Sequence, residues 1–333
     1  MTAIGTTAAI FGCLGPRLLP DEKAFFRDAD PLGFIIFARN VVSPDQLYRL
    51  TSDLRAAVGR DAVVLVDQEG GRVQRLRGPQ WREWTPPLDA ITAAKDLATA
   101  ARIMALRASL ISAELRAVGI DANCAPVADL ATDATHAFLR NRCYGSDPAS
   151  VTAIARAVAD AYLAGGVLPV VKHMPGHGRA TGDTHLDLPT VTADAATLNA
   201  TDFAPFRALA DLPMAMTAHI VFSAYDADHP ATQSARMIDV IRNDIGFHGL
   251  LMTDDLNMQA LSGSLADRTA KSLQAGCDIA LHCKGDMAEM QSVAIAAGPM
   301  RDDTRARARR ALGLRLAQPQ IDIAALEAEL SHA

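Results

Sequence analysis

Short runs of apolar residues recur along the chain, and stretches with helical periodicity separate them. The runs cover residues 8–11, 33–37, 62–66, 120–124, 167–171, 214–218, 250–252 and 278–281. They are apolar on both faces, as the buried strands of a parallel sheet are. Ala-rich stretches between them, such as 92–118 and 151–164, predict helices. Gly119 and Gly165 follow these two helices, at positions where a helix end favours a left-handed residue.

Repeated units of strand followed by helix predict an α/β protein with a (β/α)8 TIM barrel, and an open doubly wound sheet is the alternative. The chain has 333 residues and no Pro/Ser-rich linker, so we expect one catalytic domain spanning residues 1–333. Residues 286–333 are rich in Ala, Arg and Leu and predict closing C-terminal helices. No G-x-G-x-x-G motif follows the first run, which argues against a dinucleotide-binding fold.

Composition and charge narrow the classes of partner. The net charge is −6 and no basic stripe is present, which argues against nucleic acid as a partner. The five cysteines show no C-x-x-C spacing and favour reduced thiols. No run reaches the roughly 18 apolar residues of a membrane span. No basic residue precedes Arg17, so a signal peptide is not predicted. We therefore expect a cytoplasmic monomer that acts on a small molecule.

Polar residues gather directly after the predicted strands. They occupy residues 67–75, 125–144, 217–219 and 253–258, and the densest group is 172–185. The last segment contains one Lys, three His, an Arg and an Asp, and its Gly and Pro residues exclude a regular helix. Barrel enzymes carry their active sites at the carboxyl ends of the strands. The sequence therefore predicts one polar site at that end of the barrel.

A carboxylate at a strand end, paired with a proton donor, is suited to cleavage of a glycosidic bond. Asp254 is the candidate nucleophile because it is the first acid beyond an apolar run, and strand alternation predicts that Asp255 points to the opposite side. Either residue could instead cap a helix. His185 is the candidate general acid/base because imidazole titrates near neutral pH. Asp183 could accept a hydrogen bond from its second ring nitrogen.

Three cations and one further carboxylate form a second group of candidates. Arg75, Arg142 and Lys172 offer forked and single donors, and Asp67 offers an acceptor. Such groups bind sugar hydroxyls, although each of them could also belong to a structural ion pair.

Four motifs resemble those of the bacterial β-N-acetylglucosaminidases of glycoside hydrolase family 3, of the single-domain cell-wall recycling type. They are Val-Asp-Gln-Glu-Gly-Gly-Arg-Val-Gln-Arg at 66–75, Lys-His-Met-Pro-Gly-His-Gly at 172–178, Asp-Thr-His at 183–185 and Thr-Asp-Asp-Leu at 253–256. The resemblance extends from about Gly33 to Cys283. It implies a (β/α)8 barrel and a retaining mechanism through a covalent glycosyl-enzyme intermediate. The implied substrates are muropeptides such as GlcNAc-1,6-anhydro-MurNAc.

The resemblance also implies individual roles. Asp254 corresponds to the nucleophile, and His185 to the acid/base with Asp183 as its partner. The implied sugar-binding residues are Asp67, Arg75, Arg142, Lys172 and His173. Two departures from the family pattern are Met174, where an aromatic residue is usual, and Thr184, where Ser is usual. We expect neither a cofactor nor a metal ion.

Three other functions are weighed against this one. A metal-dependent hydrolase would use His173, His177 and His185, but the H-x-H motif that such barrels favour after an early strand is missing. A catalytically inactive sugar-binding barrel would be expected to lack the nucleophile or the His–Asp pair, which are both present in the sequence. An aldolase that forms a Schiff base would use Lys172, but a His-rich segment follows that residue at once.

Overall fold

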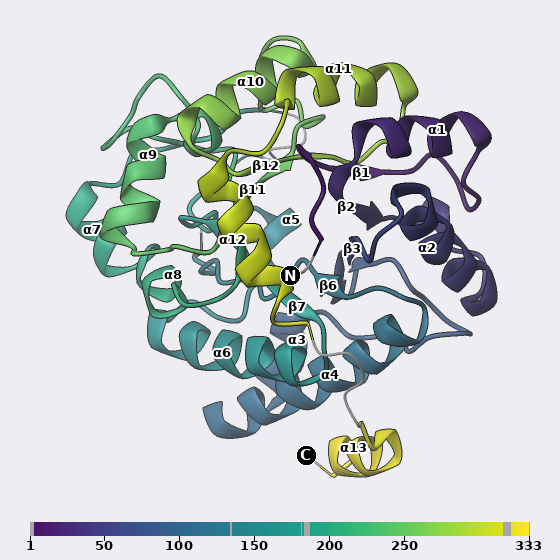
Figure 1. Cartoon of the computed structure of the whole chain (residues 1–333). Helices are drawn as coiled ribbons and strands as arrows, with labels where there is room; N and C mark the ends of the chain where they lie inside the picture. Colours follow the sequence, from purple (N-terminus) through teal and green to yellow (C-terminus); the bar gives the residue numbers. More distant parts are fainter. Residues whose placement is uncertain (1–2, 134, 181, 183–186, 316–320, 333) are drawn as a thin grey trace.

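The computed structural model describes residues 3–133, 135–180, 182, 187–315 and 321–332. Eight parallel strands close into a barrel, in the order β1-β12-β11-β9-β7-β6-β3-β2, and helices surround it (Figure 1). The barrel strands are β1 (Thr7–Gly12), β2 (Pro31–Ile36), β3 (Val63–Val66), β6 (Ala122–Asn123), β7 (Leu168–Met174), β9 (Met214–Thr217), β11 (Leu250–Asp255) and β12 (Ile279–His282). The predicted (β/α)8 barrel is confirmed.

The α-helices are α1 (Pro20–Ala29), α2 (Pro44–Val58), α3 (Pro87–Ala93), α4 (Leu97–Ala117), α5 (Ala137–Arg140), α6 (Pro148–Ala164), α7 (Ala195–Ala200), α8 (Ala204–Ala208), α9 (Ala235–Asp239), α10 (Leu265–Ala275), α11 (Met287–Ala297), α12 (Asp302–Leu312) and α13 (Ile323–Leu330). Three single turns are η1 (Ala38–Asn40), η2 (Ala231–Gln233) and η3 (Val240–Asp244). Outside the barrel, β4 (Gln68–Gly70) pairs with β5 (Val73–Gln74), and β8 (Thr190–Val191) with β10 (Val221–Phe222). No helix within the described ranges has the length and apolar content needed to cross a membrane.

Helix α2 shows how local sequence sets the helix boundaries. The Ser43 side chain accepts a hydrogen bond from the Gln46 N–H, and the Gln46 side chain accepts one from the Ser43 N–H, which forms a capping box. Pro44 follows at the first helical position, where no N–H partner is needed. Gly59 ends the helix with a φ of 63°, a conformation that costs glycine little.

The predicted helix over 92–118 is wrong in its extent, because two helices occupy that region. Helix α3 ends at Ala93, and Asp96 caps the start of α4, because its side chain accepts the Thr99 N–H at 2.8 Å. At the far end of α4, Gly119 has a φ of 76°, as predicted. The prediction for Gly165 is wrong: its φ is −79°, and Gly166, with a φ of 72°, takes the left-handed conformation one residue later.

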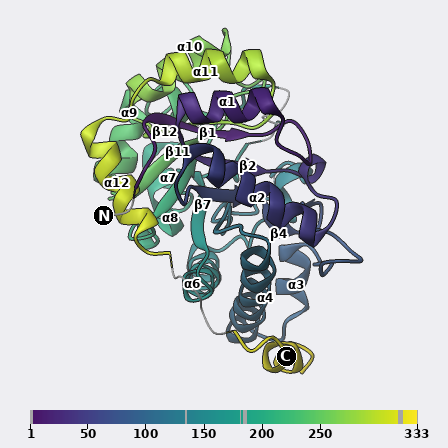
Figure 2. The same cartoon turned by 45° about the vertical axis from the view of Figure 1, so that its right-hand side comes forward.

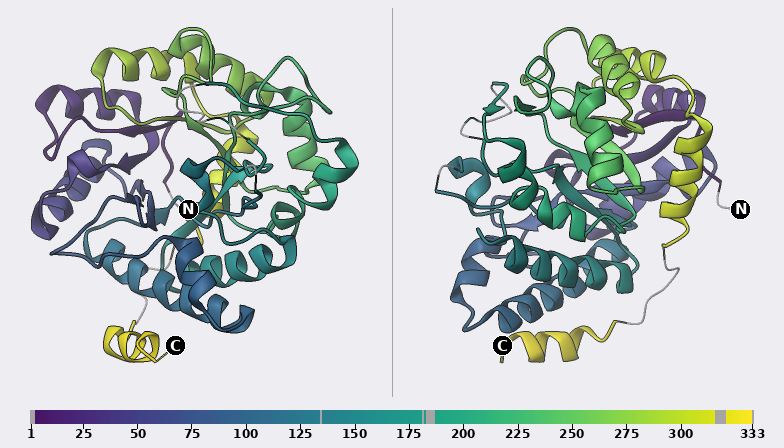
Figure 3. Two further views of the ribbon diagram at one scale, coloured as in Figure 1. Left: turned by 180° about the vertical axis from the view of Figure 1, so that it is seen from behind. Right: turned by 90° about the vertical axis from the view of Figure 1, so that its left-hand side faces the viewer.

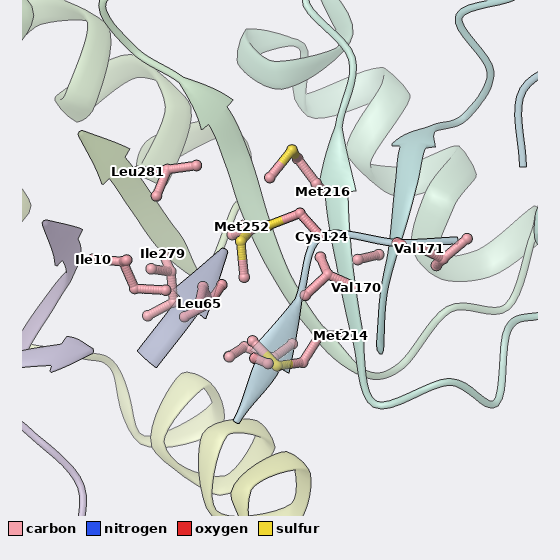
Figure 4. Close-up of a cluster of buried hydrophobic side chains, with 14 of the residues drawn as sticks. Ile10, Leu65, Cys124, Val170, Val171, Met214, Met216, Met252, Ile279 and Leu281 are labelled. Carbon is pink, nitrogen blue, oxygen red and sulfur yellow. The ribbon is translucent and has the colours of Figure 1, made fainter. Parts of the chain in front are cut away.

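The barrel interior is filled with buried aliphatic and sulfur-containing side chains from alternate positions of the strands. Figure 4 shows Ile10, Leu65, Val170, Met214, Met252 and Ile279 directed toward one another inside the barrel. Each is at most 1 % exposed. Burial of apolar surface contributes on the order of 25 cal/mol per Å2. This core holds the strand ends at fixed positions and thereby places the polar residues that follow them.

The end of the barrel near the N-terminus is fastened by a buried carboxylate. Asp278 accepts hydrogen bonds from Arg242 at 2.7 Å, from Arg307 at 2.8 Å and from the Leu251 N–H at 3.0 Å. Arg307 belongs to α12, which lies at the same end of the molecule as the N-terminus (Figure 3, right). The carboxylate therefore ties α12 to the amino ends of β11 and β12.

Helices α11, α12 and α13 lie in the segment 286–333, where closing helices are predicted. The last of them, α13, packs against α4 at the edge of the molecule (Figure 2). Arg102 of α4 forms a bidentate ion pair with Glu329 at 2.5 Å, and Arg82 pairs with Glu327. No residue of α13 is fully buried, so charged contacts make up much of this attachment.

Candidate active site

One pocket at the carboxyl ends of the barrel strands brings the candidate residues together. Its lining includes Asp67, Arg75, Arg142, Lys172, His173 and Asp254, which are the candidate site residues within the described ranges. Ile35, Phe37, Val73, Phe138, Met216, Met258 and Leu281 supply apolar lining. Asp183 and His185 lie outside the described residues. The predicted clustering at this end of the barrel is therefore observed for the candidate residues that the structure describes.

Two strands extend further into the site than the apolar pattern predicts. Lys172 and His173 belong to β7, and Asp254 and Asp255 belong to β11, rather than to the loops that follow. Strand pairing continues beyond the apolar run, because Met174 lies beside Thr217 of β9 and accepts the Ala218 N–H at 2.8 Å. The side chains are thus mounted on sheet backbone, which holds them more firmly than a loop would.

The charged residues of the pocket form a chain of alternating sign, which we call the charge ladder: Arg75, Asp67, Lys172, Glu69 and Arg142. Arg75 Nη2 lies 2.9 Å from Asp67 Oδ2, and Lys172 Nζ lies 2.9 Å from Asp67 Oδ1. The same Lys172 Nζ lies 2.6 Å from Glu69 Oε1. Arg142 completes the ladder by donating to both oxygens of Glu69 at 2.9 Å.

Pairing within the ladder keeps each of its buried groups ionised. Burial opposes ionisation of Glu69, but the Arg142 and Lys172 charges outweigh it and lower the pKa of this carboxyl to about 2. The Lys172 and Arg75 charges likewise hold the pKa of Asp67 well below its usual range, against the effect of burial. For Lys172, burial is outweighed by Asp67 and Glu69, which raise its pKa. A Schiff-base nucleophile must be a neutral amine, so this environment argues against the aldolase alternative.

A pair of amide side chains positions the hairpin that carries the ladder. The side-chain oxygen of Gln68 accepts the N–H of Arg75 at 2.9 Å and that of Leu76 at 3.1 Å. Asn123 of β6 accepts the Gln68 N–H at 2.9 Å and donates to its carbonyl oxygen at 3.0 Å. These bonds fold β4 and β5 back over the barrel. As a result, Asp67 and Glu69 both reach Lys172.

His173 has polar partners on both ring nitrogens. Its Nδ1 lies 2.6 Å from Asp129 Oδ2 and therefore carries a proton. Its Nε2 lies 3.5 Å from Arg142 Nη2, which can only donate, so Nε2 acts as the acceptor. Asp129 also accepts the N–H of His177 at 2.7 Å. Burial, with His173 nearby, lowers the pKa of His177 to about 4, so His177 is neutral at physiological pH.

Sequence reasoning missed Glu69 and Asp129 as site residues. Both stand in the polar segments singled out after the third and fourth strands, but no motif distinguished them from their neighbours. Their function in the site depends on partners far away in the chain. Glu69 needs Lys172 and Arg142, while Asp129 needs His173.

The two neighbouring carboxylates of β11 have opposite electrostatic environments. Burial works against ionisation of Asp254, but His173 and His219, together with the Asp255 N–H at 2.8 Å, outweigh it and lower its pKa. Burial raises the pKa of Asp255 to about 6, aided by the Asp254 charge. Asp254 is therefore the group that is ionised across the physiological range.

Two expectations for Asp255 are wrong. Asp255 lines the same pocket as Asp254 rather than lying on the opposite side, because the register of β11 shifts between Met252 and Asp255. Asp255 Oδ1 accepts the N–H of Asn257 at 3.1 Å and that of Cys283 at 3.2 Å. Neither carboxylate caps a helix, since Ser264 begins α10.

The turn that follows Asp254 is fixed by two further side chains. His219 Nε2 lies 3.2 Å from the Asp255 carbonyl oxygen, and its Nδ1 lies 2.7 Å from Thr232 Oγ1. Arg268 of α10 donates to the carbonyl oxygens of Leu256 at 2.8 Å and Met258 at 3.1 Å. The backbone that presents Asp254 is therefore restrained from β9 and from α10.

The metal-dependent alternative relied on three histidines. His173 and His177 pack edge to face with ring centroids 5.3 Å apart, while His185 lies outside the described residues. In the part of the chain that the structure describes, no three His, Cys, Asp or Glu side chains are grouped so that they could hold a metal ion.

Comparison with known proteins identifies the family to which the chain belongs. The family model for the glycosyl hydrolase family 3 N terminal domain matches residues 21–310. A β-hexosaminidase of Methylococcus capsulatus is 38% identical over 82% of this chain and 82% of its own, and one of Xylella fastidiosa is 36% identical over 84% of each. The crystal structure of NagZ from Neisseria gonorrhoeae in complex with N-trifluoroacetyl-D-glucosamine covers 100% of this chain and 99% of its own, with a TM-score of 0.88 and 28% identity. The chain belongs to glycosyl hydrolase family 3 and is a glycoside hydrolase of the β-N-acetylhexosaminidase type.

Proposed function

We propose that the protein is an exo-acting, retaining β-N-acetylglucosaminidase that removes terminal N-acetylglucosamine from muropeptides such as GlcNAc-1,6-anhydro-MurNAc. One observation carries the proposal: the ionised Asp254 carboxylate shares a pocket with the charge ladder. The family supports the activity, since its relatives are β-hexosaminidases. The N-trifluoroacetyl-D-glucosamine bound to the Neisseria gonorrhoeae NagZ supports an N-acylated glucosamine in the pocket.

In the first step, a carboxylate oxygen of Asp254 attacks the anomeric carbon and forms a glycosyl-enzyme ester. The bond to the leaving oxygen breaks, and that oxygen takes a proton from the acid/base residue. Water then attacks the same carbon with the acid/base residue as its base, and Asp254 is released as a carboxylate. Its lowered pKa keeps Asp254 ionised and ready for attack at neutral pH.

The charge ladder is proposed to bind the hydroxyl groups of the sugar. Asp67 offers acceptor oxygens, while Arg75, Lys172 and Arg142 offer N–H donors. His173 extends the set with a ring nitrogen. Because the ladder residues pair with one another, they form a polar surface whose geometry is already set before the sugar arrives.

His185 is proposed as the acid/base residue and Asp183 as the residue that orients it. The support is the Asp-Thr-His motif at 183–185, which follows β7 in the chain. We further propose that residues 1–333 act as one catalytic domain, with 286–333 as closing helices, and as a monomer in the cytoplasm. The five cysteines are free and buried, which supports a reducing compartment.

The proposal is tested by comparing Asp254→Asn with Asp255→Asn. Asp254→Asn should lower kcat for an aryl β-N-acetylglucosaminide by several orders of magnitude while the circular dichroism spectrum is retained. A 5-fluoro N-acetylglucosaminyl fluoride should label Asp254 in the wild-type protein, as peptide mass spectrometry would show. A label on Asp255, or near wild-type turnover by Asp254→Asn, would contradict the proposal.

A further inference from the structure

The stretch of β11 that carries Asp254 is held to β12 partly by side chains. The register between these two strands shifts beside Asp254. Thr253 Oγ1 accepts the Leu281 N–H at 3.0 Å. On the other side of Asp254, Asp255 Oδ1 accepts the Cys283 N–H at 3.2 Å. In a regular parallel ladder such N–H groups pair with backbone carbonyl oxygens, so the neighbours of Asp254 here supply side-chain acceptors in their place.

Asp255 is the centre of the hydrogen bonds around the proposed nucleophile. Its N–H donates to Asp254 Oδ1 at 2.8 Å. Its carbonyl oxygen accepts the Met258 N–H at 3.1 Å and lies 3.2 Å from His219 Nε2. Its Oδ1 also accepts the Asn257 N–H at 3.1 Å. The orientation of the Asp254 carboxylate therefore depends on where Asp255 is held.

The charge of Asp255 sets the strength of the two hydrogen bonds to its Oδ1. A carboxylate accepts charge-assisted hydrogen bonds, which are about twice as strong as those to a neutral acceptor. Burial, aided by the Asp254 charge, raises the pKa of Asp255 to about 6. Asp255 therefore loses its charge as the pH falls through about 6, whereas Asp254, whose pKa is lowered, stays ionised.

Neighbouring elements bring further titratable and charged groups to Asp255. Within the described residues, they are Asp254 of β11, His219 after β9, Arg268 of α10, Cys283 after β12, and Glu289 of α11, which reaches Asp255 through Asn257. Burial raises the pKa of the Cys283 thiol well above its usual value, so this thiol is uncharged near pH 6. Burial lowers the pKa of His219 from 6.5, so His219 also gains a proton at acidic pH and must be separated from Asp255 in a test.

We propose that Asp255 is a positioning residue for the nucleophile, and that its ionised carboxylate holds Asp254 in the orientation needed for attack on the anomeric carbon. The inference rests on the proposed function, in which Asp254 is the nucleophile. Thr253 fastens the same stretch from the other side, but its hydroxyl does not titrate in this range. Protonation of Asp255 weakens the bonds to β12 and to the following turn. The loss should appear in kcat rather than in KM, because the charge ladder binds the sugar in the ground state.

The test is the pH dependence of kcat/KM with an activated aryl β-N-acetylglucosaminide, whose leaving group needs little protonation. Wild-type activity should fall as the pH drops through about 6. Asp255→Asn keeps an acceptor oxygen but not the charge. It should lower kcat roughly tenfold at pH 7.5 with KM nearly unchanged, the difference between a charged and a neutral hydrogen-bond acceptor. It should also lack the decline near pH 6, so that the two enzymes converge at about pH 5.

Two further variants separate positioning from titration. Thr253→Val removes the other side-chain bond to β12, so it should lower kcat while the decline near pH 6 remains. Thr253→Ser keeps the hydroxyl and should restore most of that loss. Asp267→Asn is the matched control, because Asp267 accepts the Ser264 N–H at 3.2 Å on the exposed first turn of α10. It should change neither kcat nor the pH profile.

Labelling with the 5-fluoro N-acetylglucosaminyl fluoride counts the competent sites in each variant, so that misfolded protein is not mistaken for slow turnover. A decline near pH 6 that persists in Asp255→Asn would overturn the inference and assign the titration to another group such as His219. An unchanged kcat in Asp255→Asn would overturn it as well. If the wild type neither cleaves the aryl glycoside nor takes the label on Asp254, the proposed function fails instead.

Discussion

Glu69 is the buried centre of the charge ladder, and Glu69→Gln isolates the energetic contribution of its charge. Its side chain is 1% exposed and contacts Lys172 at 2.6 Å and Arg142 at 2.9 Å. Glutamine preserves the size of the side chain and one acceptor oxygen, and it resembles the protonated carboxyl. The substitution therefore leaves two buried cations with one counter-charge fewer.

The size of the effect follows from the pKa of Glu69. Burial would raise this pKa, but Arg142 and Lys172 lower it from 4.5 to about 2. A difference of this size corresponds to about 3 kcal/mol in the free energy of unfolding. Removing one partner of a buried ion pair typically costs about 3–5 kcal/mol, which agrees. Because the pKa is lowered in the folded state, this stabilisation is fully present above pH 4.5 and is lost as the pH falls toward about 2.

Urea denaturation at pH 7 and pH 3.5 provides the measurement. At pH 7, Glu69→Gln should unfold with a free energy about 3 kcal/mol below that of the wild type, and the gap should narrow by about 1.4 kcal/mol at pH 3.5. Glu83→Gln is the control, because Glu83 is exposed and pairs with Arg77 at the surface; it should cost at most about 1 kcal/mol. A gap below about 1 kcal/mol at pH 7, or one independent of pH, would refute this account of the ladder.

Two further predictions concern the opposite end of the barrel and the acid/base pair. Asp278→Asn should lower the free energy of unfolding in urea by about 3–5 kcal/mol, because Arg242 and Arg307 lose a buried counter-charge. Its kcat/KM should stay within about twofold of the wild type, and a larger change in the folded variant would show that the two ends of the barrel are coupled. His185→Ala should slow glycosides with poor leaving groups more than activated aryl glycosides, because poor leaving groups need protonation, and Asp183→Ala should do so more mildly. Equal losses for both kinds of substrate would remove the acid/base assignment.

The barrel could be predicted from sequence because buried parallel strands are apolar on both faces and leave an unmistakable pattern. The positions at which these strands end could not be predicted from the sequence. Lys172, His173 and Asp254 are polar and so indicated loops, yet they continue β7 and β11. Lys172 pairs with Asp67 and His173 with Asp129, residues that follow other barrel strands, and such partners allow polar side chains to lie on a buried strand. Hydrophobic patterning cannot register such long-range pairing.

The same limit explains which site residues were found. Asp67, Arg75, Arg142 and Lys172 could be named as donors and acceptors for sugar hydroxyls. Glu69 stands in the motif at 66–75, but its role became visible only as the group that joins Lys172 to Arg142. A buried partner of this kind has no local signature. Glu69 is important because it contacts both Lys172 and Arg142, which are far apart in the sequence and are brought together by the fold.

Two aspartates, Asp278 and Asp254, differ in how many hydrogen bonds their carboxylates accept. At the end of the barrel near the N-terminus, Asp278 accepts hydrogen bonds from two arginines, the Thr304 hydroxyl and a backbone N–H. Among the described residues, Asp254 receives a hydrogen bond only from its neighbour's N–H, and the nearby His173 and His219 lower its pKa against the effect of burial. An ionised oxygen with few donors keeps lone pairs available for a substrate, whereas a saturated one serves the fold. The proposed nucleophile is thus distinguished from a structural aspartate such as Asp278 by the hydrogen-bond donors that it lacks.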